Sequence, residues 1–140
     1  MTNREIGSLI YATAFSDEMP AFMCSLIEAQ SKHETGNYTS NAFLKNNNCF
    51  GYKYVKGAKF QVAPGITSTE GNPYAKYASI ENSVHELCAW IRRRQKEKKF
   101  PEDLNVITSP DQYARLLKFC GYYGDPLKNY INGLTLYLET

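Results

Sequence analysis

Two glutamates, Glu34 and Glu70, are the residues of this 140-residue chain whose type and spacing suggest a reaction. Glu34 follows an apolar pattern of helical period and stands two residues before Gly36, so it falls in the last turn of a predicted helix. The negative end of the helix dipole, together with packed aromatic rings, should raise the pKa of a carboxyl group at this place. Such a group can act as a general acid near neutral pH, whereas the alternative is an exposed glutamate at a fraying helix end.

Glu70 lies in residues 63–73, a segment punctuated by prolines and glycines that is predicted to be a loop or hairpin. Two carboxyl groups on opposite walls of a groove are the usual requirement for hydrolysis of a glycosidic bond. One protonates the leaving oxygen, and the other activates a water molecule or stabilises the oxocarbenium ion. Because two glutamates at this spacing are common by chance, the pair by itself indicates this chemistry only weakly.

The elements that must position these two residues are helices on either side of a short β-like segment. Thr2 and Glu5 form a capping-box pattern, which predicts the start of the first helix. Helices are predicted over residues 3–15, 20–34 and 40–45, and again after Ser79, Ser109 and Asp125. Strands are predicted over residues 49–55, 60–62 and 74–77. This order predicts a mostly helical α+β fold, with residues 1–140 forming a single domain.

The helix after Ser79 carries both Trp90 and a run of basic residues from Arg92 to Lys99. Trp90 lies outside the apolar stripe of this helix, so we expect its ring to line a cleft. The basic run is expected to be the solvated end of the helix, where cations interact favourably with the dipole. A role for this run in binding an anionic polymer is the alternative.

Composition excludes several classes of function. The net charge of +2 is too small to indicate a nucleic-acid partner, and no stretch is long and apolar enough to span a membrane. The 11 tyrosines are compatible with an aromatic groove that binds sugars or peptides. The four cysteines and two histidines show no metal-ligand spacing, so we expect neither a metal nor a cofactor and predict buried free thiols.

Four short motifs follow one another over residues 20–138: Ala29-Gln30-Ser31-Lys32-His33-Glu34-Thr35-Gly36, Asn47-Asn48-Cys49-Phe50-Gly51-Tyr52-Lys53, Tyr77-Ala78-Ser79-Ile80-Glu81-Asn82-Ser83 and Gly121-Tyr122-Tyr123-Gly124-Asp125-Pro126. In this order they resemble the motifs of the peptidoglycan glucosaminidases of the flagellar-rod hydrolase and autolysin type, glycoside hydrolase family seventy-three. The chain departs from that family at Lys32 and His33, where small or apolar residues are usual. It departs again at Tyr123 and Gly124, which replace Ala-Thr.

This resemblance implies a lysozyme-like fold, in which a helical lobe and a small β-lobe flank the active-site groove. It implies that Glu34 is the catalytic acid and that Glu70 is the second carboxylate, on the β-lobe. The remaining candidates for contact with the sugar come from the motifs and from the predicted cleft. They are Phe50 and Gly51 in the groove floor, Tyr122, Tyr77 and Trp90.

The function that the resemblance implies is hydrolysis of the β-1,4 bond between N-acetylglucosamine and N-acetylmuramic acid, with a peptidoglycan glycan strand as partner. Two alternatives stay open: a lytic transglycosylase on a related fold, which uses a single acid, and a non-catalytic wall-binding or virion structural module. We expect a monomer without stable insertion into a membrane. Because residues 1–23 do not resemble a signal peptide, we expect synthesis in the cytoplasm and action at the bacterial cell wall, after phage lysis, virion delivery or another export route.

Overall fold

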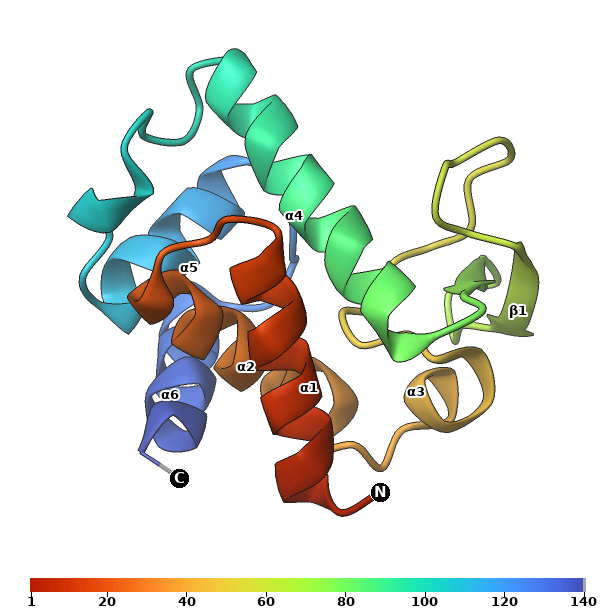
Figure 1. Ribbon diagram of the computed structural model, residues 1–140. Helices are drawn as coiled ribbons and strands as arrows, with labels where there is room; N and C mark the ends of the chain where they lie inside the picture. The colour runs from red at the N-terminus through yellow and green to blue at the C-terminus, as the bar shows by residue number, and fades with distance from the viewer. Residues whose placement is uncertain (140) are drawn as a thin grey trace.

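The computed structural model describes residues 1–139, and its elements confirm the mostly helical α+β class (Figure 1). Helices α1 (Asn3–Ser16), α2 (Ala21–Thr35) and α3 (Asn41–Asn46) precede a hairpin of strands β1 (Ala63–Thr67) and β2 (Pro73–Lys76). Helix α4 (Ile80–Lys96), the 3-10 helix η1 (Leu104–Val106), α5 (Pro110–Phe119) and α6 (Leu127–Leu138) follow. Within residues 1–139, every helix is too short or too polar to cross a lipid bilayer.

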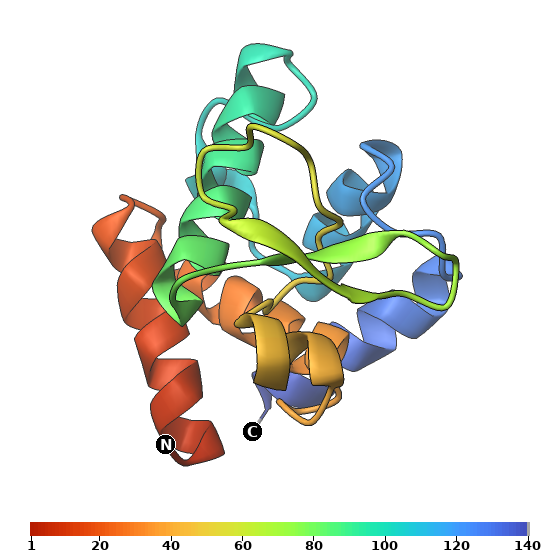
Figure 2. The ribbon, with the colours of Figure 1, turned by 90° about the vertical axis from the view of Figure 1, so that its right-hand side faces the viewer.

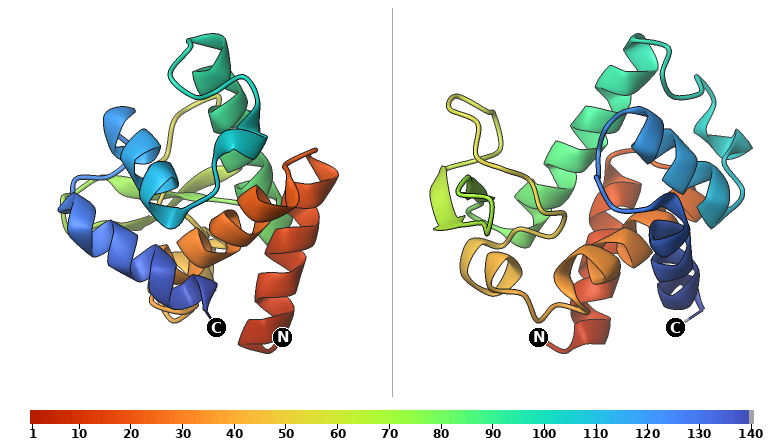
Figure 3. Two further views of the ribbon diagram at one scale, coloured as in Figure 1. Left: turned by 90° about the vertical axis from the view of Figure 1, so that its left-hand side faces the viewer. Right: turned by 180° about the vertical axis from the view of Figure 1, so that it is seen from behind.

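Helix α4 runs between two lobes. Helices α1, α2, α5 and α6 lie on one side of it, and α3 lies with the hairpin on the other (Figure 1). The hairpin crosses in front of the helices when the molecule is viewed from its own side (Figure 2). From behind, α5 and α6 lie beside α2, on the opposite side of the molecule from the hairpin (Figure 3). A helical lobe joined to a small β-lobe is the lysozyme-like arrangement that the motifs imply.

Helix α2 carries Glu34 in its last turn, as predicted. Gly36 caps the helix in the left-handed conformation (φ 59°, ψ 48°), and its N–H donates to the carbonyl oxygen of Lys32. A glycine adopts this conformation without the steric cost of a side chain, so the helix ends at a defined residue. The helix is also held by its buried face, where Leu26 and Ile27 are fully buried in the core between α1, α2 and α6.

All four cysteines are free thiols, as predicted. Cys24, Cys49 and Cys88 are buried as predicted, whereas the prediction of burial is wrong for Cys120, which is partly exposed near the end of α5. Burial raises the pKa of the Cys24 thiol to about 11 and that of Cys49 to about 12. A thiol with so high a pKa stays protonated at neutral pH, so these two side chains act as small apolar core residues and not as nucleophiles.

The β-lobe contains fewer strands than predicted. Residues 49–55 and 60–62 are not strands, and the hairpin begins instead at Ala63, which pairs with Lys76. The first of these segments does run along β2, but it makes only the isolated bridge between Lys53 and Tyr74 within the part of the chain that the structure describes. The prediction of strands failed here because alternation indicates only which side chains face inward. It does not indicate whether the backbone forms the hydrogen bonds of a sheet.

The side chain of Asn48 adds to the few backbone hydrogen bonds that the first of these segments makes with β2. Asn48 is fully buried, and its oxygen accepts hydrogen bonds from the backbone N–H groups of Phe50 (3.3 Å) and Gly51 (2.9 Å). Its amide nitrogen donates to the carbonyl oxygens of Tyr52 (2.9 Å) and Ala75 (3.0 Å). One side chain therefore bonds to four backbone groups, of which the Tyr52 carbonyl also accepts from the N–H of Ala75 (2.9 Å).

Gln61, in the second segment, uses its side chain to bond the backbone of the first segment. Its side-chain oxygen accepts from the N–H of Val55 (2.8 Å), and its amide nitrogen donates to the carbonyl oxygen of Lys53 (3.2 Å). The same nitrogen donates to the carboxylate of Glu86 on α4 (2.7 Å). The loop before β1 is thus tied to α4 by a side chain and not by a strand ladder.

We expect Asn48→Ala to lower the free energy of unfolding by about 3 kcal/mol, since several buried backbone groups lose their partners. Urea unfolding followed by circular dichroism measures the change. Asn132→Ala is the matched control, because Asn132 is exposed on α6 and its replacement should alter stability by less than about 0.5 kcal/mol. Equal stability of the Asn48→Ala variant and the control would contradict the role assigned to Asn48.

Candidate active site

A hollow of about 340 Å³ opens beside the carboxyl group of Glu34. It is lined by the end of α2, the loop after α3, the turn between β1 and β2, and the segment that precedes α6. Five of the residues predicted from the sequence line it: Glu34, Phe50, Gly51, Glu70 and Tyr122. The fold therefore brings together groups that are widely separated along the chain.

A second hollow, of about 410 Å³, adjoins the first. The two share Lys53, Glu70 and Tyr122 among their lining residues, so we treat them as one groove with two halves. Glu34 lies in one half and Trp90 in the other, where the Trp90 ring packs edge-on against that of Tyr122 (centroids 5.3 Å apart). Trp90 lines this half as expected, but its side chain is only 9% exposed and belongs to the buried face of α4, so the prediction that it lies outside the apolar stripe is wrong.

Tyr77 is the predicted site residue that the structure does not bring to the groove. Its side chain is only 1% exposed, and it lines neither half. The hydroxyl of Tyr77 donates a short hydrogen bond to the carboxylate of Glu86 on α4. The prediction that Tyr77 contacts a sugar is therefore wrong. Its side chain has a structural role instead, because it joins the residue after β2 to α4.

The carboxyl group of Glu34 has the electrostatic character of a general acid. Burial raises its pKa from 4.5 to about 7, which confirms the direction predicted from the sequence. Asp125 adds to this rise through its negative charge, whereas the hydroxyl of Tyr130 and the ammonium group of Lys53 lower the pKa. Since burial is the largest of these effects, the low polarity around the helix end accounts for the shift.

Gly51 lets the main chain pass directly beside this carboxyl group. Its φ is +75°, and a Cβ atom added to it would lie 3.3 Å from Oε2 of Glu34. A side chain at this position would press on the carboxyl oxygen and would also strain the backbone. The glycine of the second motif is therefore explained by the space that Glu34 occupies.

Tyr122 forms a fixed wall of the groove. Its hydroxyl donates to the carbonyl oxygen of Phe50 (2.9 Å), and its ring meets that of Tyr52 edge-on (centroids 5.7 Å apart) as well as that of Trp90. Burial raises the pKa of the Tyr122 hydroxyl well above its usual value, so the group stays neutral. These contacts hold the Tyr122 ring in place at the groove.

Glu70 lies on the turn between β1 and β2 and is exposed. The turn is held by hydrogen bonds from the N–H of Ser68 to the carbonyl oxygen of Asn72 (2.8 Å) and from the N–H of Gly71 to that of Ser68 (3.0 Å). Because Glu70 lines both halves of the groove, the β-lobe contributes a second carboxylate to the site that contains Glu34.

Lys53, Tyr74 and Asp125 are among the lining residues of the groove that sequence reasoning did not identify as site residues. The ammonium nitrogen of Lys53 lies 3.9 Å from the centre of the Tyr74 ring, so a cation–π contact holds it at the groove. Lys53 and Asp125 both stand inside motifs quoted above, and this was the signal that could have identified them.

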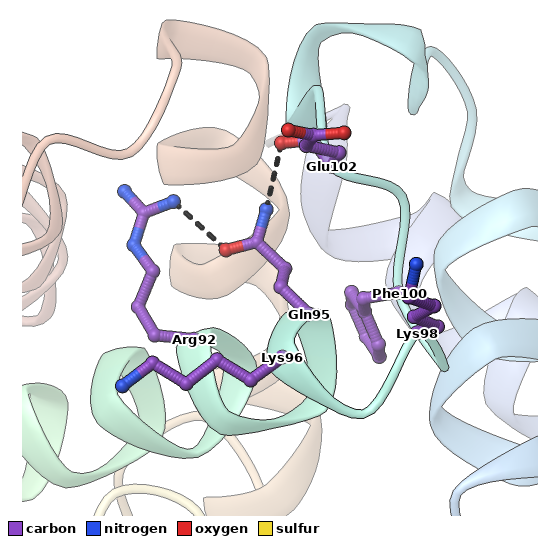
Figure 4. Close-up of a pocket in the computed structure, with 6 residues that line it drawn as sticks. All are labelled: Arg92, Gln95, Lys96, Lys98, Phe100 and Glu102. Carbon is purple, nitrogen blue, oxygen red and sulfur yellow. Dashed lines mark hydrogen bonds between the residues drawn. The ribbon is translucent and has the colours of Figure 1, made fainter.

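A larger hollow, of about 610 Å³, lies elsewhere, at the C-terminal end of α4 (Figure 4). Gln95 spans it, accepting a hydrogen bond from Arg92 (3.0 Å) and donating one to the carbonyl oxygen of Glu102 (3.0 Å). Its rim is formed by the exposed side chains of Lys96 and Lys98. This is the solvated basic end of the helix that the sequence predicts, and it shares no lining residue with the groove.

The comparison with known proteins agrees with this geometry. No curated protein and no solved structure matches the chain. Residues 12–139 match the glucosaminidase family model, whose description is mannosyl-glycoprotein endo-beta-N-acetylglucosaminidase. The match spans both Glu34 and Glu70 and covers most of the chain. The chain therefore belongs to the glucosaminidase family of glycoside hydrolases.

Proposed function

We propose that the protein hydrolyses the β-1,4 bond between N-acetylglucosamine and N-acetylmuramic acid in peptidoglycan. The observation that carries this proposal is the carboxyl group of Glu34, whose pKa is raised to about 7 beside a groove that also receives Glu70. A raised pKa keeps a large fraction of this group protonated near neutral pH, as a general acid requires.

The proposed mechanism uses the two carboxyl groups in different roles. Glu34 donates its proton to the oxygen that links the two sugars, so the bond from that oxygen to the anomeric carbon of N-acetylglucosamine breaks. Glu70 activates the attacking water or stabilises the positive charge that develops on the sugar ring. The ring of Tyr122, packed against the buried ring of Trp90, provides an apolar surface on which a sugar face can pack.

The choice of peptidoglycan as substrate rests on the four motifs, which resemble those of the peptidoglycan glucosaminidases. We propose that the protein works as a monomer formed by one domain, on the glycan strand of the bacterial wall. Its route to the wall would be phage lysis, delivery by a virion or another means of export.

A lytic transglycosylase is the second candidate, because Glu70 is exposed on a turn and a reaction with one acid would not need it. Digestion of purified peptidoglycan, reduction with borohydride and mass spectrometry separate the candidates. Our proposal predicts new chain ends of reduced N-acetylglucosamine. Anhydro-muramic ends would instead show that the protein is a lytic transglycosylase. The absence of products would indicate a non-catalytic wall-binding or virion module.

We expect kcat/KM to fall with rising pH above about pH 7, where Glu34 loses its proton. The fall should approach tenfold per pH unit, since only the protonated acid can donate. A pH series on soluble peptidoglycan fragments measures this limb. In a Glu34→Asp variant with residual activity the limb should shift or vanish, and an unchanged limb in that variant would mean that another group is the acid.

A further inference from the structure

Behind Glu34, on the side away from the groove, the protein buries polar groups that the proposed mechanism does not use. Gln30 lies one helical turn before Glu34 on α2 and is fully buried. Its side-chain oxygen accepts a hydrogen bond of 2.5 Å from the hydroxyl of Tyr113. Its amide nitrogen has no hydrogen-bond partner of regular geometry among residues 1–139. A buried amide nitrogen is costly to leave unpaired, so its presence calls for a reason.

Tyr130 on α6 presents a second buried polar group at the same place. The residue is fully buried, its ring stacks on that of Tyr123 (centroids 3.9 Å, planes 8° apart), and the His33 ring meets it edge-on at 4.7 Å. Its hydroxyl lies close enough to the side chains of both Gln30 and Glu34 to interact with each of them. Within the described chain, however, the hydroxyl also lacks a partner of regular geometry.

We propose that Gln30 and Tyr130 are positioning residues for the carboxyl group of Glu34, which they hold through a buried chain of hydrogen bonds. The chain has one consistent direction. Tyr113 donates to the side-chain oxygen of Gln30 and so fixes the orientation of the amide. The amide nitrogen is then turned to donate to the oxygen of Tyr130, and the hydroxyl proton of Tyr130 is left for Glu34. This inference rests on the role proposed above for Glu34.

Such a chain gives the two oxygens of the Glu34 carboxyl group different tasks. One oxygen accepts from Tyr130 at the back, and the other faces the groove beside Gly51, where the proton must be delivered. The ring stacking on Tyr123 restricts the movement of Tyr130, so the donor is held on the rigid packing between α2 and α6. A general acid whose rotation is restricted in this way is already in position when the sugar binds.

The hydrogen bond from Tyr130 also affects the protonation of Glu34. A donor to a carboxylate stabilises the ionised form, so it lowers the pKa that burial raises. The other titratable groups that face Glu34 or lie next to Tyr130 are those of His33, Lys53, Glu70, Tyr113, Tyr122, Tyr123 and Asp125. Of these, Lys53 acts in the same direction as Tyr130, and Asp125 acts in the opposite direction.

The test is the pH profile of kcat/KM for Tyr130→Phe, which keeps the stacked ring and removes only the hydroxyl. We expect the alkaline limb to move to higher pH by about one unit, because the ionised form of Glu34 loses a charge-assisted hydrogen bond. We also expect kcat on the acidic side of the limb to fall by roughly tenfold, because the acid is less well oriented. A residue that served packing alone could lower kcat but would not move the limb.

Gln30→Met provides a second, independent variant that keeps the volume of the side chain. It should move the limb in the same direction by a smaller amount, and adding it to Tyr130→Phe should give no further shift, because both residues act through one hydrogen bond to Glu34. Tyr11→Phe is the control, since Tyr11 is a partly buried tyrosine of α1 that does not line the groove. Its limb should match that of the wild type.

An unmoved limb in folded Tyr130→Phe, or shifts that simply add in the double variant, would overturn this proposal. If Tyr130→Phe does not fold, an unmoved limb in Gln30→Met overturns it equally. Failure of the proposed function has a separate signature, because it would appear as full turnover by Glu34→Gln. If Glu34→Gln is inactive but the alkaline limb of Tyr130→Phe stays at the wild-type pH, Glu34 remains the acid and only the positioning role of Gln30 and Tyr130 is refuted.

Discussion

Replacement of Glu34 by glutamine is expected to reduce hydrolysis by roughly 10²–10⁴-fold, the usual contribution of general acid catalysis. The amide has almost the same shape as the carboxylic acid but cannot donate a proton to the leaving oxygen. Gly51, which lies against this side chain, should accommodate the substitution without moving. Initial rates on soluble peptidoglycan fragments measure the loss, and turnover near that of the wild type would remove Glu34 from the mechanism.

Stability measurements provide the control for this variant. In the folded protein the pKa of Glu34 is raised from 4.5 to about 7, so the unfolded state loses its proton first as pH rises. The carboxyl group therefore opposes folding increasingly between pH 4.5 and 7, by at most about 3 kcal/mol above that range. Glu34→Gln should match the wild type in stability near pH 4 and exceed it at pH 8. A variant that is inactive and also less stable at pH 8 would indicate a disturbed fold instead of a lost acid.

Replacement of Glu70 by glutamine is expected to lower kcat on the order of 10²-fold while leaving glycan binding nearly unchanged. Glu70 lies on a turn, and such segments are often mobile, so its carboxylate can approach the sugar as the β-lobe closes on a glycan. If Glu70 positions a water molecule on the far face of the sugar, azide should partly restore turnover. The product would then be a glycosyl azide of inverted configuration.

Single-turnover hydrolysis of a defined glycan, with and without azide, measures both effects. If the acetamido group of the substrate is the nucleophile, Glu70 only stabilises charge, the loss is smaller and azide gives no inverted product. A loss below about tenfold, or roughly 1.4 kcal/mol of barrier, would exclude Glu70 from the catalytic residues and leave Glu34 as the single acid. Glu81→Gln, on α4 and outside both halves of the groove, is the matched control and should retain full activity.

The helical part of the fold was accessible to sequence reasoning because its signals are local. Thr2 and Glu5 make the capping box that the sequence predicts, and Ser79 and Ser109 cap the helices that follow them. Gly36 ends α2 where expected, and this alone fixes Glu34 in the last turn. Each of these features depends on residues only a few positions apart, so tertiary contacts did not have to be known.

The β-lobe was less predictable because side chains make part of its backbone hydrogen bonds. The alternation after Asn48 resembles a strand, yet the segment forms only one bridge to β2, and the amide of Asn48 bonds the backbone on either side. Nothing in the local pattern distinguishes the two cases. The burial of Tyr77 likewise depends on Glu86, which the next helix supplies.

The site was predicted to the extent that its residues stand in motifs. Glu34, Phe50, Gly51 and Tyr122 were identified in this way, and they do line one groove. The raised pKa of Glu34 was predicted in direction, from the helix dipole and packed aromatic rings, but the burial that is its largest cause involves the packing of α2 against α6, which the sequence does not show. Tyr130 in particular reaches Glu34 only through that packing, since it lies far away in sequence and in no motif.

The most direct test of this account is digestion of peptidoglycan in water enriched in ¹⁸O, with wild type and Glu34→Gln in parallel. Products are reduced with borohydride at once, before the label can exchange, and analysed by mass spectrometry. The account predicts one ¹⁸O atom at the anomeric carbon of each new N-acetylglucosamine end for the wild type, and almost no such ends for Glu34→Gln. Unlabelled anhydro-muramic ends, or equal labelling by the two proteins, would contradict it.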